Sequence, residues 1–252
     1  MHTQPTAESR WSAGVFLAFF VSLMVGWLTL MSVFDFPDIL RAAPEARFTL
    51  FQAREAIIVP AYYALALSSA LQLFMAVAMY RLVGKSGLLD LSALAAGVAG
   101  GIFQMLGFFR WVILIPALSR ALAAGEMPAD TVFAFERFAN TYLGMTVGEH
   151  LGSLLVGLWM LCLGVRLVRE AHWGKALAWL ALASALALLL TSLENLGPGF
   201  AWIGVLTAAL WGLYLTWVLL MAVAFLSRRA PGTGWWIFGG LFYLGNVLPS
   251  FL

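Results

Sequence analysis

Long apolar runs of about 20 residues dominate this sequence, and short clusters of charged side chains separate them. In an α-helix, which rises 1.5 Å per residue, about 20 apolar residues span the hydrocarbon core of a bilayer. Charged residues make up only 10% of the 252 residues and hydrophobic residues 63%, an excess that a water-soluble core of this size does not hide. The chain is therefore predicted to be an all-α, polytopic transmembrane bundle in a single integral membrane domain, residues 1–252. A soluble enzyme and a nucleic-acid-binding protein are excluded.

The apolar runs predict about seven transmembrane spans. They cover residues 12–34, 56–80, 88–118, 141–165, 175–195, 200–226 and 235–252. The last run has about 18 residues, which is only just enough to cross a bilayer. The predicted bundle is therefore six spans plus a short C-terminal span, with a re-entrant last segment as the alternative.

Lys and Arg gather in the connections at one end of the predicted bundle. The segment before the first span and the loops after the second, fourth and sixth spans contain Arg10, Arg81, Lys85, Arg166, Arg169, Lys175, Arg228 and Arg229. In the opposite connections, acidic residues outnumber arginines. Because positively charged loops stay in the cytoplasm, we predict a cytoplasmic N-terminus.

The two longest connections, residues 35–55 and 119–140, lie on the predicted outer face. Each contains a proline, Pro44 or Pro128, with an acidic residue one or two places later. Proline and an acidic side chain both suit the first turn of a helix. We expect a short interfacial helix in each of these outer loops.

Most polar residues cluster at the ends of the predicted spans, but three ionisable residues lie farther inside: Arg110, Glu149 and His150. Counting residues from the outer span ends places Arg110 and Glu149 at the same depth, roughly 12 Å below the outer boundary. A charge there costs about 2.5–3.5 kcal/mol on insertion scales, so it needs a partner. We predict an Arg110–Glu149 ion pair. Its alternative roles are a functional site and a purely structural contact.

Polar residues form a stripe on the fourth predicted span. Tyr142, Thr146, Glu149 and Ser153 have the spacing of one α-helical face. Glycines every fourth residue beside this stripe favour close packing against the third span, which has a similar glycine face. We expect an outward-facing polar pocket whose candidate ligand-binding residues are Arg110, Trp111, Tyr142, Thr146, Glu149, His150, Glu194 and Asn195.

No cofactor and no metal site is predicted. One cysteine and three histidines are too few for the usual metal centres or for a bis-histidine haem, although a His–Met haem pair stays open. His150 is expected to be a hydrogen-bonding core residue. The phosphate-binding Gly-Lys-Ser/Thr loop, the His-Glu-x-x-His motif and the Gly-x-Ser-x-Gly elbow are all missing from the sequence.

Three segments resemble a family of uncharacterised bacterial polytopic membrane proteins that is defined by a domain of unknown function. They are FPDILR at residues 36–41, Phe109-Arg110-Trp111 with the following Pro116, and GEHLG at residues 148–152. The resemblance covers roughly residues 15–200. It implies a multi-pass protein of the bacterial inner membrane with Arg110, Glu149 and His150 in family motifs, and it implies no activity.

Three functions are compatible with these features. The first is binding or transport of a small polar or anionic ligand, which Arg110 holds while Glu149 positions it or exchanges protons with it. The second is a non-catalytic subunit of a larger membrane complex, which the glycine faces and short loops favour. The third is a membrane enzyme or haem-binding protein that acts on a lipid-soluble substrate. The expected partners are the lipid bilayer and either further copies or complex partners, with no nucleic acid.

Overall fold

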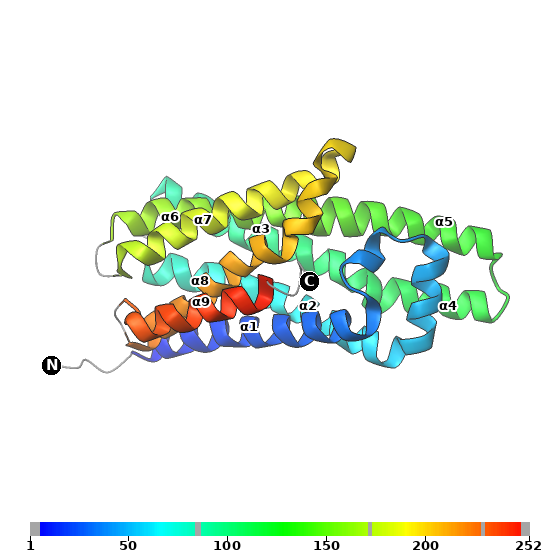
Figure 1. The fold of residues 1–252 in the computed structure, drawn as a ribbon, viewed down its shortest axis with the longest axis horizontal. Helices are drawn as coiled ribbons and strands as arrows, with labels where there is room; N and C mark the ends of the chain where they lie inside the picture. The colour runs from blue at the N-terminus through cyan, green and yellow to red at the C-terminus, as the bar shows by residue number, and fades with distance from the viewer. Residues whose placement is uncertain (1–5, 84–86, 171–172, 228–229, 248–252) are drawn as a thin grey trace.

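The computed structural model describes residues 6–83, 87–170, 173–227 and 230–247 as an elongated bundle of helices (Figure 1). Within these residues every regular element is helical. The α-helices are α1 Ala7–Phe34, α2 Pro44–Leu82, α3 Leu88–Phe109, α4 Ile115–Ala123, α5 Ala129–Ala139, α6 Gly152–Val168, α7 Lys175–Ser192, α8 Thr207–Ser227 and α9 Thr233–Val247. The connecting helical segments are η1 Asp38–Arg41, η2 Arg110–Leu114, η3 Asn140–Leu151, η5 Leu193–Leu196 and η6 Pro198–Leu206.

Six helical stretches in the described residues are long and apolar enough to cross a membrane, which confirms the predicted polytopic helical bundle. They are Ala7–Phe34, Pro44–Leu82, Leu88–Ala123, Ala129–Val168, Lys175–Leu196 and Pro198–Ser227. Several are longer than the predicted spans, because α2, α4 and α5 extend beyond the end of α1. The 15 residues of α9 make about 22 Å of helix, less than the hydrocarbon thickness. The predicted span 235–252 reaches past the described residues, so a seventh crossing stays a prediction.

Two apolar clusters follow each other along the bundle. One is centred on Phe16, Trp159 and Trp217, and the other on Phe34 and Trp111. All five side chains are fully buried. Leu23 of α1 packs against both clusters, and a cavity lies beside it where the two clusters meet.

The connections at the end of α1 are more helical than expected from the sequence. Pro44 does begin a helix, but residues 44–53 form only its first section, because Arg54 has non-helical backbone angles that kink α2. This section runs across the end of the bundle (Figure 1). The loop 119–140 instead contains the hairpin of α4 and α5, which runs along the long axis (Figure 1). The position of both segments relative to a bilayer stays a prediction.

Two segments, η2 and η3, are π-helices whose hydrogen bonds run from residue i to i+5. The segment η3 joins α5 to α6 and packs against α3. A Cβ atom on Gly107 would lie 2.7 Å from the Cα atom of Gly148, so the two backbones touch at this point. The predicted close packing of the third and fourth spans is therefore confirmed, with Gly107 against η3 and with Gly97 and Gly100 against residues of α6.

Candidate functional site

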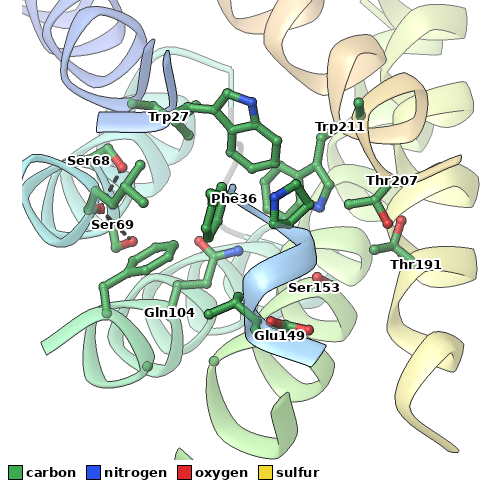
Figure 2. A pocket seen from close by; sticks show the side chains of 18 of the residues that line it. Trp27, Phe36, Ser68, Ser69, Gln104, Glu149, Ser153, Thr191, Thr207 and Trp211 are labelled. Carbon is green, nitrogen blue, oxygen red and sulfur yellow. Dashed lines mark hydrogen bonds between the residues drawn. The ribbon is translucent and has the colours of Figure 1, made fainter. Parts of the chain in front are cut away.

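A cavity of about 220 Å³ lies inside the bundle between the two apolar clusters. Aromatic rings form much of its wall: Trp27, Phe36, Tyr62, Phe108 and Trp211. Its polar lining residues are Arg41, Ser68, Ser69, Gln104, Arg110, Glu149, Ser153, Thr191, Glu194, Asn195 and Thr207. Figure 2 shows Trp27 and Trp211 directed into the cavity from two different helices, with Glu149 and Ser153 on another side.

Arg110 is buried, with 6% of its surface exposed, and all its hydrogen-bond partners are neutral. Its Nη1 atom donates to the Gly107 carbonyl at 2.6 Å and its Nη2 atom to Asn140 Oδ1 at 3.0 Å, while Nε has no partner. The guanidinium carbon lies 5.7 Å from the centroid of the Trp111 ring. Among the residues that the structure describes, no carboxylate is within ion-pair distance, 4.0 Å, of this guanidinium. The predicted Arg110–Glu149 ion pair is therefore wrong, because the π-helix brings Asn140 and the bare backbone of Gly144 to Arg110 instead.

Glu149 also has no ion pair within 4.0 Å in the described parts of the chain. One of its oxygens accepts a hydrogen bond from Asn195 Nδ2 at 3.2 Å, and the same amide donates to the Met145 carbonyl at 3.3 Å. The hydrogen-bond partners that the structure gives Arg110 and Glu149 are thus neutral, although the Arg41 guanidinium acts on Glu149 at longer range. A charge without a direct counter-ion is costly where water is scarce, so the buried Arg110 and the partly buried Glu149 are both suited to a charged partner from outside the chain.

An ion pair does lie at the end of the cavity nearest to the α1–α2 connection. Arg41 of η1 forms an ion pair with Glu194 of η5, and the Thr207 hydroxyl donates to the other Glu194 oxygen at 3.2 Å. Burial alone would lower the pKa of Arg41, but the carboxylates of Glu149, Glu194 and Asp38 outweigh it and raise that pKa above its usual value. Arg41 therefore stays cationic.

Four of the eight candidate residues line the cavity, namely Arg110, Glu149, Glu194 and Asn195. Tyr142 and Thr146 do not. Tyr142 is 53% exposed and stacks on Phe138, and the Thr146 hydroxyl donates to the Thr141 carbonyl. In an α-helix, two residues seven positions apart lie on nearly the same face. In a π-helix, with about 4.4 residues per turn, they lie on opposite faces. The stripe from Tyr142 to Glu149 was therefore wrong, and only its Glu149–Ser153 part faces the cavity.

Trp111 and His150 lie behind the cavity wall. Trp111 is fully buried and stacks on Tyr62 with ring centroids 5.1 Å apart, so it supports Arg110 from the second apolar cluster. The Nδ1 atom of His150 is hydrogen-bonded to the Ser192 carbonyl, which joins η3 to the end of α7. This contact has the form expected of a hydrogen-bonding core residue.

A chain of polar contacts behind Arg110 had no signal in the sequence. Arg47 makes two hydrogen bonds to Glu136, at 2.7 and 2.5 Å, in a pair whose side chains are 4% and 0% exposed. Arg47 and Asn140 both donate to the Leu40 carbonyl, at 3.2 and 2.9 Å. These contacts connect α5, α2 and the 36–41 segment to Asn140 and so to Arg110. Residue spacing does not reveal them, because the partners are far apart in sequence and belong to connections that appear solvated.

The cavity offers charges and hydrogen bonds to a ligand. Within the described parts of the chain, no three His, Cys, Asp or Glu side chains come together as metal ligands. The groups that do converge are two guanidiniums, two carboxylates, amides and hydroxyls, and all are suited to bind a polar head group.

Comparison with known proteins gives a family and nothing finer. A family model described as a domain of unknown function (DUF4386) matches residues 12–245. No curated protein and no solved structure matches the chain.

Proposed function

The chain belongs to the DUF4386 family of domains of unknown function, and from its cavity we propose that it binds, or binds and transports, a small ligand with an anionic group. Arg110 is the anion-binding residue in this proposal. Glu149, Glu194 and Asn195 position the rest of the ligand.

The proposal rests on the hydrogen bonds that Arg110 leaves unmade. A guanidinium can donate five hydrogen bonds, and in Arg110 two neutral acceptors are engaged while Nε has none. Arg110 nevertheless reaches the cavity. A carboxylate or phosphate there would supply the missing counter-charge and a bidentate acceptor, which is the geometry that Arg binds best.

The protein's setting is proposed to be the bacterial inner membrane, with the N-terminus in the cytoplasm. The ion pair of Arg81 with Glu8 and that of Arg166 with Asp90, at 3.2 and 3.5 Å, lie at the ends of spans where α1 begins. The rest of the basic cluster is in the same connections, while the acidic connections flank the end of α1. This distribution favours basic connections inside the cell.

Binding of two matched phosphates to the purified protein tests the function. Glycerol 3-phosphate and lysophosphatidic acid share a phosphate monoester, but only the second has an acyl tail. We expect at least one of them to raise the apparent unfolding temperature in a neutral detergent, because a ligand that binds the folded state stabilises it. The shift should vanish in Arg110→Met and persist in Arg120→Met, whose side chain is 70% exposed. An equal shift in Arg110→Met, or none in the parent protein, would overturn the proposal.

A further inference from the structure

The cavity lies where two antiparallel helices separate. In one half of the bundle α1 and α8 are in direct contact: Ser9 donates to the Phe225 carbonyl, and Phe19 packs on Tyr214 with centroids 5.8 Å apart. Farther along, α1 contributes Met24, Trp27 and Met31 to the cavity and α8 contributes Trp211 and Thr207. The two helices therefore enclose the cavity between their diverging ends.

This cavity reaches the outer surface of α1. Leu28 and Met31 both line it, yet they are 55% and 43% exposed. They belong to the helix Ala7–Phe34, which is apolar enough to cross the membrane. Residues at the rim of the cavity thus face the hydrocarbon region, where a lipid tail is the natural neighbour.

The other end of the cavity is covered by the α1–α2 connection. Phe36, Pro37, Leu40 and Arg41 line it there, and the Arg41–Glu194 ion pair joins this connection to the end of α7. The α1–α2 connection therefore covers the side where the outward opening is expected. The apolar side beside α1 instead has exposed lining residues.

The two charges without counter-ions lie on one wall of the cavity. The Arg110 guanidinium packs on Gly144 of η3, and Glu149 follows five residues later, close to one full turn of a π-helix. A head group that carries only an anion would meet Arg110 and leave Glu149 without a direct ion pair. A head group with an anionic group and a protonated amine would neutralise both.

We infer that the ligand is an amphiphile from the bilayer whose head group carries both an anion, held by Arg110, and a protonated amine, held by Glu149. Its apolar tail extends past Trp27 and Trp211 toward the opening beside Leu28 and Met31. This inference rests on the proposed function, since it uses Arg110 as the anion-binding residue. It adds that the ligand has a protonated amine and an apolar tail, and that the ligand enters the cavity from the bilayer beside α1.

Four probes with matched parts test it on the full-length protein in a neutral detergent. Lysophosphatidylethanolamine has the zwitterionic head and the tail, lysophosphatidic acid has the anion and the tail, dodecylamine has the cation and the tail, and glycerophosphoethanolamine has the head alone. We expect the first to bind at least about tenfold tighter than each of the others, since one charge-assisted hydrogen bond contributes that much or more. In Glu149→Gln the affinity for lysophosphatidylethanolamine should fall to that for lysophosphatidic acid. Glu45 has an exposed carboxylate, so Glu45→Gln should leave the affinity for lysophosphatidylethanolamine unchanged.

The outcomes separate the two proposals. If lysophosphatidic acid or glycerophosphoethanolamine binds as tightly as lysophosphatidylethanolamine and Arg110→Met abolishes this binding, the amphiphilic zwitterion is overturned and the proposed function stands. If no probe shows binding that depends on Arg110, both are overturned. An unaltered affinity for lysophosphatidylethanolamine in Glu149→Gln, with the Arg110 dependence kept, overturns the assignment of the amine to Glu149.

Discussion

Arg110 is a charged residue whose position depends on a neighbour without a side chain. Its guanidinium lies directly on the Cα atom of Gly144, where a Cβ atom would collide with the guanidinium carbon. Glycine is therefore needed at position 144 for contact and not for an unusual backbone angle. The spacing of Gly144 and Gly148 also allows α3 to approach η3 closely.

Gly144→Ala is expected to displace the Arg110 side chain and weaken its bonds to Asn140 and the Gly107 carbonyl. Binding of the phosphate probes should fall by about tenfold or more, because a charged hydrogen bond contributes about 1.5–3 kcal/mol. The measurement is a titration of the purified variant with each probe. Gly14→Ala is the matched control, since nothing lies within 4 Å of a Cβ atom there. Parent-like binding in Gly144→Ala would contradict the assigned role of Gly144.

The Arg47–Glu136 pair is the most deeply buried ion pair that the structure shows among its described residues. Glu136→Gln would leave Arg47 buried without its counter-ion, at a cost of about 3–5 kcal/mol. We expect the apparent unfolding temperature in detergent to fall by roughly 10 °C, since each kcal/mol shifts it by about 2–4 °C in a chain of this size.

The exposed pair of Arg120 and Glu55, 3.9 Å apart, supplies the comparison. Glu55→Gln should lower the unfolding temperature by no more than about 3 °C, because exposed ion pairs contribute less than about 1 kcal/mol. Equal shifts in Glu136→Gln and Glu55→Gln would mean that the buried pair is not the stabilising contact that its geometry indicates.

At the scale of whole helices, the sequence predicts where the spans lie, but in the π-helix η3 it does not predict which face each residue occupies. Apolar run lengths place the spanning helices well, because the hydrocarbon thickness fixes them. The same runs predicted a shared pocket for Arg110 and Glu149, and both residues line one cavity, while their depth in a bilayer stays a prediction. Which face a residue occupies depends on the helical period, and a 12-residue π-helix has no signature in apolar spacing. That is why Glu149 and Ser153 were placed correctly and Tyr142 and Thr146 were not.

Arg41 shows that the sequence pattern also does not predict how a connection folds. Like the rest of the connection 35–55, Arg41 belongs to the predicted outer face. In the structure η1 folds back so that Arg41 meets Glu194, whose carboxylate is 6% exposed. A connection that closes over a cavity has no periodicity, so only the tertiary structure reveals it.

The α1–α2 connection should control access of water to the cavity. We expect that a Ser153→Cys side chain, which lines the cavity and replaces a residue 2% exposed, reacts slowly with a water-soluble maleimide in a Cys162→Ser background. Arg41→Met removes the ion pair to Glu194 and should raise this rate several-fold, while Arg120→Met should not change it. A rate that is the same with and without Arg41 would show that the ion pair does not close this end.

On the scale of the whole molecule, the charges divide between the two ends of one bundle and the cavity lies within it. The described helix ends next to the basic connections lie at the end of the bundle where α1 begins, while α4, α5 and the first section of α2 lie beyond the other end of α1 (Figure 1). The polar network of Glu136, Arg47, Leu40 and Asn140 joins this extended end to Arg110. A contact made on the α4–α5 hairpin is therefore connected to the cavity through buried bonded groups.

Single cysteines in a Cys162→Ser background test the orientation of the whole bundle. Glu126→Cys lies in the turn between α4 and α5, whereas Lys175→Cys and Thr233→Cys lie at the starts of α7 and α9, and all three positions are exposed. An impermeant maleimide applied to right-side-out vesicles should label the first and leave the other two unlabelled until the vesicles are opened. A cysteine appended after Leu252 should also be labelled from outside if the last apolar run crosses, because six spans return residue 233 to the cytoplasmic side. If only that cysteine is protected, the last segment is re-entrant. If Lys175→Cys is labelled in closed vesicles, the bundle has the opposite orientation.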